Sequence, residues 1–332
     1  RPLALVLIAI ALALAFAPFL FPGTKSLDTA ARICIFIVLV ASYDLLLGYT
    51  GLLCFGHAMF FGTAAYMTGL ALKTTGVSIE LAIAFGGIVA GLMGLVVGYL
   101  AIRRQGIQFA MITLAFSQLV FFVLLQSEFT GGEDGMQAIP RTPLFGIFNV
   151  EDSFTYYYVI LAMAILAVAA YYRIVNSPYG EVLKAVRDNQ ERVESLGFSP
   201  EKVKLVAFIL SATMAGVAGG MKATVYQFAT LTDASWQVSG EVIVMTLLGG
   251  LGTLTGPLFG AGIIIWLNDE LAGFGEWALI LQGVILLLVI IFFRRGFVGE
   301  LSALWRWLAR RRDGGAELAA RAAAAARAAA AA

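Results

Sequence analysis

Six ionisable or amide side chains lie within or beside long apolar stretches, where their chemistry is least expected: Asp44, His57, Gln118, Lys222, Glu241 and Gln282. An ionisable group in hydrocarbon costs free energy, so each should face other protein groups, a water-filled cavity or a membrane interface. His57 is the only histidine of the chain, and it either makes structural hydrogen bonds or lines a polar path through the protein. Asp44 and Lys222 lie close to the ends of their stretches, which favours anchoring at the interface.

Motifs for covalent chemistry and nucleotide binding are missing from the sequence. A P-loop requires Gly-Lys followed by Ser or Thr, but none of the six lysines follows a glycine. A single histidine and two isolated cysteines, Cys34 and Cys54, do not provide the ligand spacing of a metal site. We therefore expect no enzyme activity, no metal and no cofactor bound by this chain, and any ATP would be hydrolysed by another subunit.

The composition identifies lipid as the main solvent of the chain. Of its 332 residues, 60% are hydrophobic and 13% are charged, and the mean hydropathy is +0.89. Soluble domains carry about 45–50% apolar and about 25% charged residues, so this much apolar surface exceeds what one aqueous core can bury. The net charge of +1 gives no reason to expect nucleic acid or an acidic substrate.

Ten apolar stretches approach the length of about 20 residues that a helix needs to cross a bilayer. The glycine-rich region between Gly249 and Gly262 either breaks one helix or forms a re-entrant turn. The sequence predicts an all-α, polytopic transmembrane helix bundle of about ten spans, with a membrane domain at 1–300 and a tail at 301–332 that is Ala-rich at its end. The expected spans are 2–22, 29–47, 52–72, 78–100, 107–127, 154–175, 205–225, 238–254, 257–273 and 276–293.

Lysine and arginine are distributed unequally between the connecting segments, which predicts the orientation of the chain. With a cytoplasmic N-terminus, the inside segments hold fifteen basic residues and the outside segments hold five, leaving out the distal Arg321 and Arg327. Both termini are therefore predicted to be cytoplasmic. The acidic loop at 128–153 is then periplasmic, and the charged loop at 176–204 is cytoplasmic.

Glycine and alanine recur at helical spacing in several spans, for example at Gly87, Gly91, Gly94 and Gly98. Small residues let helices approach closely in lipid, where there is little hydrophobic drive between them. Such rows are typical of a tightly packed bundle, and some of them could let helices slide or tilt. The candidate residues of a translocation path are Gly51, Gly56, His57 and Glu241.

The cytoplasmic loop contains an amphipathic segment at 180–197. Charged residues separate its apolar positions at roughly helical spacing, and Gly197 suits the end of a helix. The segment either lies on the inner leaflet or docks into a groove of a cytoplasmic partner. Its apolar positions are Val182, Leu183, Val186, Val193 and Leu196.

Three runs of the sequence resemble LivM-type permeases of the branched-chain (hydrophobic) amino acid ABC importer family. They are YDLLLGYTGLLCFGHAMFFG at 43–62, TGGEDGM at 130–136, and SPYGEVLKAVRDNQERVESLG at 177–197 followed by KLVAFILSA. The resemblance implies a permease subunit of an ATP-driven importer in a bacterial inner membrane. It also implies a homologous second permease, two cytoplasmic ATPase subunits that bind ATP and Mg, and a periplasmic substrate-binding protein.

The resemblance also assigns roles to individual residues. Glu191 and Gly197 match the EAA---G coupling motif of importer permeases, although Arg192 and Val193 replace its two alanines. The residues expected to couple to the ATPase are Glu181, Arg187, Glu191 and Gly197. Those expected to contact the binding protein are Gly131, Gly132, Glu133 and Asp134.

The solute and the energy source are open at this stage. The family implies branched-chain amino acids or a related small polar solute, and urea, short amides and aromatic acids are alternatives within it. A weaker alternative is a secondary transporter coupled to protons or sodium, in which Asp44, His57 and Glu241 would act as relays. A channel and a membrane enzyme are the remaining alternatives.

Overall fold

The computed structural model describes residues 24–143, 153–271 and isolated positions between 273 and 299. These residues are nearly all helical, and no β-strand occurs among them. The expected spans at 2–22 and 276–293, Gln282 and the Ala-rich tail lie wholly or mainly outside this part. The α-helices are α2 Thr24–Thr50, α3 His57–Thr75, α4 Ile79–Ala101, α5 Ile107–Gln126, α6 Ser153–Val175, α7 Pro178–Asp188, α8 Gln190–Ser195, α9 Pro200–Tyr226, α10 Trp236–Gly249 and α11 Gly256–Leu271, and the short 3₁₀ helices are η1 Glu128–Thr130, η2 Gly132–Asp134 and η3 Leu231–Ala234.

Five helices within the described residues are long and apolar enough to cross a membrane. They correspond to five of the expected spans, and the described helices support a multi-span helical membrane protein without establishing ten spans. The five segments are Leu27–Thr50, Ile79–Ala101, Ile107–Gln126, Phe154–Val175 and Pro200–Tyr226.

The glycine-rich region forms the turn of a helical hairpin. α10 has 14 residues, and at about 1.5 Å per residue it is shorter than the hydrocarbon core of about 30 Å. Gly250 and Gly252 both have positive φ, a conformation that glycine adopts at little cost. The backbone of Gly249 lies directly against that of Gly256, so α10 and α11 pack closely around the turn. A short helix of this kind is tolerated at membrane depth when protein surrounds it.

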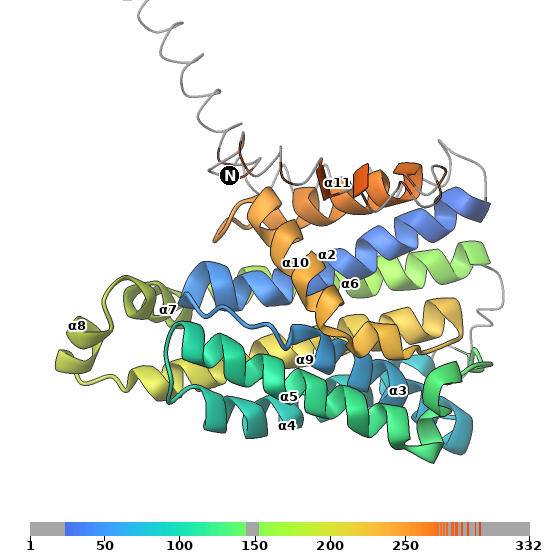
Figure 1. The fold of residues 1–332 in the computed structure, drawn as a ribbon, viewed down its shortest axis with the longest axis horizontal. Helices are drawn as coiled ribbons and strands as arrows, with labels where there is room; N and C mark the ends of the chain where they lie inside the picture. The colour runs from blue at the N-terminus through green and yellow to red at the C-terminus, as the bar shows by residue number, and fades with distance from the viewer. Residues whose placement is uncertain are drawn as a thin grey trace, which may run out of the picture.

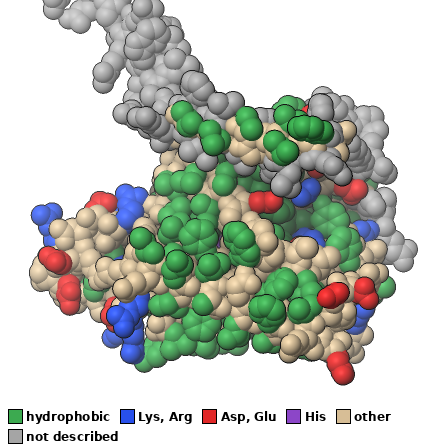
Figure 2. Space-filling model, viewed as in Figure 1, with side chains coloured by type: hydrophobic (Ala, Val, Ile, Leu, Met, Phe, Trp, Pro, Cys, Tyr) green, Lys and Arg blue, Asp and Glu red, His purple; other side chains and the backbone are tan. Residues whose placement is uncertain are grey.

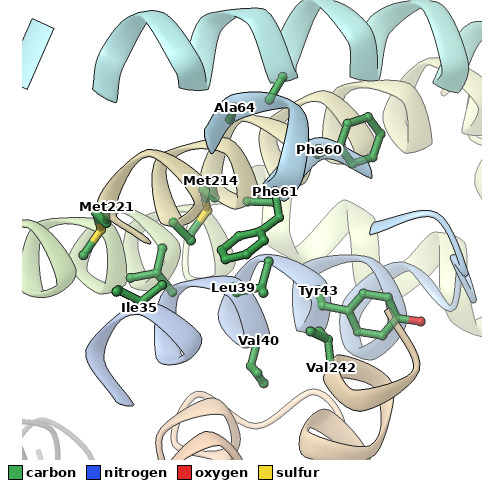
Figure 3. Packing of buried hydrophobic residues seen from close by; sticks show 14 of the residues in the cluster. Ile35, Leu39, Val40, Tyr43, Phe60, Phe61, Ala64, Met214, Met221 and Val242 are labelled. Atoms are coloured by element: carbon green, nitrogen blue, oxygen red, sulfur yellow. The ribbon is translucent and has the colours of Figure 1, made fainter. Parts of the chain in front are cut away.

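α2 and α9 form the centre of the bundle. α9 packs against α2, α3 and α4. α2 is the most buried of the five long helices, because 78% of the residues in its most apolar stretch lie inside the protein. Figure 3 shows Leu39 of α2 next to Phe61 of α3, with Met214 of α9 nearby, and Tyr43 of α2 beside Val242 of α10. In α5 and in α6, only 28% of the residues in the most apolar stretch are buried. The two helices therefore leave apolar surface for lipid or another subunit.

The glycine row of α4 explains how α9 approaches so closely. A side chain at Gly91 would collide with Thr213 of α9, and one at Gly94 would collide with Ala212. Further along α9, Gly219 lies against the backbone of Phe61 in α3. These contacts confirm that the small residues serve tight helix packing.

Two groups of short helices mark opposite ends of the bundle (Figure 1). α7 and α8 project beyond the long helices at one end, and η1 and η2 follow α5 at the other. The segment at 180–197 forms two helices instead of one, because Asn189 is extended and its side chain accepts a hydrogen bond from the backbone N–H of Arg192 at 3.0 Å. An asparagine in this position caps the second helix.

Candidate functional site

Four cavities lie in a row between the two ends of the bundle. The first, of about 480 Å³, lies beside Asp134 of η2 and the turn after α9. The second, of about 340 Å³, shares Tyr226 and Phe228 with the first and is enclosed by α2, α3, α9, η3 and α10. Neighbouring cavities in this row share wall residues, so they lie next to one another.

The series continues along α10 toward the α7–α8 end. The third cavity, of about 530 Å³, shares Thr232, Val238 and Glu241 with the second. The fourth, of about 450 Å³, shares Trp236 with the third and lies against the start of α5 and the segment after α2. Its wall is almost entirely apolar, so polarity decreases along the series.

Two ion pairs lie at the second cavity. Lys222 Nζ is 2.6 Å from Asp233 Oδ2, and Arg32 is 3.4 Å from Asp269 Oδ1. Figure 2 looks onto a hollow below α11 that holds both acidic and basic side chains. Glu241 also lines this cavity, but it has no hydrogen bond or ion pair with any residue the structure describes.

The candidate path residues separate into two groups. Gly51, with a φ of +73°, lines the fourth cavity, and Glu241 lines the second and third. His57 is fully buried and lines none of the four; its Nε2 lies 2.8 Å from Ser42 Oγ. Gly56 is also buried, with its α carbon against the backbone of Thr113 in α5.

The non-helical segment 51–56 is held by side-chain hydroxyls. The backbone N–H of Phe55 donates to Thr113 Oγ1 of α5 at 3.2 Å. Just after the segment, the N–H of Ala58 donates to Ser239 Oγ of α10 at 2.9 Å. The segment therefore bridges α5 and α10, the two helices that line the fourth cavity with it.

Asp44 occupies a position that sequence reasoning did not anticipate. The expectation that it anchors at the membrane interface is wrong, because its side chain is fully buried. Its Oδ2 accepts a hydrogen bond from the Tyr171 hydroxyl at 2.6 Å, and its Oδ1 accepts one from the Gly252 N–H at 2.9 Å. Asp44 thus joins α2 to α6 and to the α10–α11 turn. The interface expectation is also wrong for Lys222, which turns inward to Asp233.

The expected ATPase-coupling residues differ in their surroundings. Glu181 and Glu191 are exposed, and Gly197 ends α8 with a φ of +89°. Arg187, in contrast, reaches back into the bundle and donates from Nη1 to the carbonyl of Gly48 at 2.5 Å. This contact attaches α7 to the end of α2.

The expected binding-protein contacts lie at the opposite end from α7 and α8. Glu133 and Asp134 are exposed on η2, and Asp134 also lines the first cavity. Gly131 and Gly132 both have positive φ and turn the chain between η1 and η2. The loop is tied down where Met136 pairs with Ala229 through reciprocal backbone hydrogen bonds. Residues 144–152 of this loop lie outside the described part.

Comparisons with known proteins identify a transport family. The family described as "Branched-chain amino acid transport system / permease component" matches residues 26–293. The high-affinity branched-chain amino acid transport system permease protein LivM of Salmonella typhimurium is 27% identical over 317 residues, which cover 89% of this chain and 74% of that protein. LivM of Escherichia coli K12 is 26% identical over the same shares. No solved structure matches the chain.

A second type of permease in the same family is also similar. The probable branched-chain amino acid transport permease protein LivH of Methanocaldococcus jannaschii is 25% identical over 290 residues, covering 81% of this chain and 89% of that protein. The match over most of the chain confirms the resemblance to LivM-type permeases that the three sequence runs indicated.

Proposed function

Because the chain belongs to the family of branched-chain amino acid transport permease components, we propose that it forms one of two permease subunits of an ATP-driven importer. Its solute is a branched-chain amino acid or a related small polar molecule, and the membrane is a bacterial inner membrane. The observation that carries the proposal is the series of four cavities that leads from η2 to the segment after α2. In this proposal the series is the chain's share of the solute route.

The α7–α8 end has the features of a docking surface for an ATPase. Leu183, Val186 and Val193 turn inward, whereas Leu196 and Phe198 remain 70% and 50% exposed. Exposed glutamates and arginines surround these two apolar side chains. An apolar centre with a charged rim suits a helix that inserts into a groove of a partner.

Movement of α7 and α8 would reach the long helices through specific hydrogen bonds. Arg187 holds the end of α2 through Gly48. The Tyr179 hydroxyl donates to the carbonyl of Val203 at 2.7 Å, and Lys204 Nζ donates to Gln190 Oε1 at 2.8 Å, so α7 and α8 are also attached to α9. Closure of an ATPase pair would therefore displace α2 and α9, the two central helices, together.

Asp44 extends this connection to the cavities. It lies one helical turn before Gly48 and binds both α6 and the α10–α11 turn. A displacement at the end of α2 would thus change the position of α10, which lines three of the four cavities. ATP shifts such an equilibrium only through its different affinity for the two states, so the permease itself need not bind solute tightly.

The η1–η2 end would receive the binding protein. The carboxylates of Glu133 and Asp134 are exposed beside the mouth of the first cavity. Charges at the rim of an interface mainly accelerate and orient association. We expect a basic patch on the binding protein to face them.

Reconstitution of the complete importer tests this function. The chain would be co-expressed with its second permease and ATPase, purified as a complex and placed in proteoliposomes with the binding protein. We expect L-leucine uptake with ATP at the ATPase side and no uptake with ADP. Uptake by vesicles that contain this chain alone, or uptake independent of nucleotide, would instead indicate an ion-coupled transporter or a channel and would overturn the proposal.

A further inference from the structure

The second cavity contains one charged group that its own surroundings do not neutralise. Lys222 is paired with Asp233, and Asp233 also accepts hydrogen bonds from the backbone and hydroxyl of Thr230 at 3.0 and 2.9 Å. The carboxylate of Glu241 has no such partner among the described residues, although its residue is half-buried. A partly buried carboxylate that makes no hydrogen bond or ion pair is unfavourable, which suggests that a cationic group of the solute binds to it.

Arg32 provides a complementary group on the facing wall. Arg32 of α2 lines the same cavity as Glu241 of α10. A guanidinium has five N–H donors, whereas Arg32 makes a single long contact of 3.4 Å to Asp269. Most of its donors therefore remain available to a carboxylate.

The rest of the cavity is suited to a small apolar side chain. Ile35, Phe36, Phe61 and Val238 give the same cavity an apolar part of its wall. The volume of about 340 Å³ lies at the small end of the range of about 300–1,000 Å³ for ligand pockets. A cavity lined by a carboxylate without a hydrogen bond to any described residue, a guanidinium with unused N–H donors and apolar side chains matches the three parts of an aliphatic α-amino acid.

We propose that the second cavity is a solute-binding subsite for aliphatic α-amino acid zwitterions, in which Glu241 binds the ammonium group and Arg32 binds the carboxylate. The Lys222–Asp233 pair holds the wall in place, and the apolar residues receive the side chain. The inference rests on the proposed function, since it assumes that solute travels along the cavity series. It makes Glu241 and Arg32 the residues that distinguish zwitterions from neutral or singly charged solutes.

Thiol protection in the assembled importer tests the subsite. V238C places a reactive group in the wall of the second and third cavities, and L53C places one in the fourth. The native Cys34 and Cys54 are buried, so they should contribute little labelling by N-ethylmaleimide. The complex is labelled without nucleotide or binding protein in the presence of L-leucine, 4-methylpentanoate or 3-methylbutylamine.

We expect L-leucine to slow the labelling of V238C severalfold and to leave L53C unchanged. The two analogues, which lack the ammonium and the carboxylate respectively, should give no protection. E241Q in the V238C background should abolish protection, whereas E128Q, which alters an exposed carboxylate of η1, should retain it. Unchanged labelling of L53C in the E241Q background shows that this variant keeps the fold.

The outcomes separate the subsite from the function as a whole. If ATP-dependent L-leucine uptake is normal but neither V238C nor a second reporter, T232C, is protected, the subsite is wrong and the importer function stands. Equal protection by 4-methylpentanoate, or protection that survives E241Q, would refute the role of Glu241 in binding the ammonium. Absence of ATP-dependent uptake in the parent complex would refute the proposed function itself.

Discussion

The ion pairs at the α7–α8 end of the bundle and those at the second cavity differ in how exposed they are to solvent. At the α7–α8 end, ion pairs join residues close in sequence, such as Glu181 with Lys184 at 2.9 Å, and their side chains are exposed. At the second cavity, the pair of Lys222 and Asp233 is only 12% exposed on both sides and holds η3 against α9. Exposed pairs contribute little to stability, so the first end keeps its charges available for a partner, whereas the second uses them to fix the shape of a cavity.

In the proposed importer, this contrast separates an exposed surface that would bind other subunits from buried contacts that would transmit their movement to the cavities. The buried contacts include those of Asp44, which is fully buried and joins three parts of the chain. Substitutions at the exposed end should therefore change association with other subunits, and substitutions at the buried contacts should change folding and coupling.

The largest effect is expected from D44A. It leaves the Tyr171 hydroxyl and the Gly252 N–H without an acceptor, and each unsatisfied buried donor costs about 1–3 kcal/mol. We expect a clearly lower thermal midpoint of the complex in detergent and loss of ATP-dependent uptake. Y171F removes only one of the two donors and should have the smaller effect; equal midpoints for D44A and the parent would contradict the role of Asp44.

Two double-mutant cycles compare the ion pair at the second cavity with the ion pair on α7. K222A leaves the carboxylate of Asp233 unpaired in a nearly closed site, so we expect a loss of about 2–3 kcal/mol, below the about 3–5 kcal/mol of a fully enclosed pair. D233N and the double variant K222A/D233N complete the cycle, and the double variant should recover much of that loss.

The matched cycle uses K184A and E181A on α7. An exposed pair of this kind contributes about 0.3–0.5 kcal/mol, so the thermal midpoint should hardly change. Thermal or denaturant unfolding of the purified complex measures both cycles. Similar coupling energies at the two sites would remove the distinction between the two ends.

The apolar surface at the α7–α8 end can be tested by L196D combined with F198D. Two carboxylates on a desolvated contact should weaken ATPase binding at least about tenfold, which corresponds to about 1.4 kcal/mol. Titration of the ATPase onto the two-permease complex measures the Kd, and an unchanged thermal midpoint serves as the control for folding. E194Q, on the same exposed helix, is the matched conservative variant and should bind nearly normally.

The smallest effect is expected from E133Q combined with D134N in the outer loop. These residues are exposed, so their removal should mainly lower the association rate of the binding protein, and the reduction should shrink as salt screens the charges. Stopped-flow or surface-binding kinetics at low and high salt would measure this. A change confined to the dissociation rate would show that the two carboxylates are not steering charges.

The sequence allowed the helical architecture and the family to be predicted, because long apolar stretches and local motifs depend on neighbouring residues. The expected span at 107–127 and the helix α5 nearly coincide. The span expected at 52–72 begins only at His57, because residues 51–56 are not helical. The two glycines at the ends of this segment are the sequence signal for the break, although the apolar pattern concealed it. In the structure Gly51 has a positive φ, and Gly56 directly precedes the helix.

The site could be predicted only in part, because its contacts connect distant residues. Asp44 stood out as a charge in an apolar stretch, but Tyr171 is 127 residues away and Gly252 is 208 residues away. Arg32 and Asp233 carry no local pattern that points to a cavity. Glu241 was predicted to line a translocation path because it is a charged residue beside an apolar stretch. The structure shows that it lines a cavity, which the sequence alone could not show.

The hydroxyl contacts around residues 51–56 have a mechanical consequence for the innermost cavity. Thr113 and Ser239 each bind a backbone N–H of this region, so pulling α5 away from α10 would leave amides without acceptors where water is scarce. The walls that this chain contributes to the fourth cavity belong to residues 51–56, α5 with the residue before it, and α10. We therefore expect these three segments to move together as one unit, so that in the proposed importer the width of this cavity changes when the second permease moves relative to that unit.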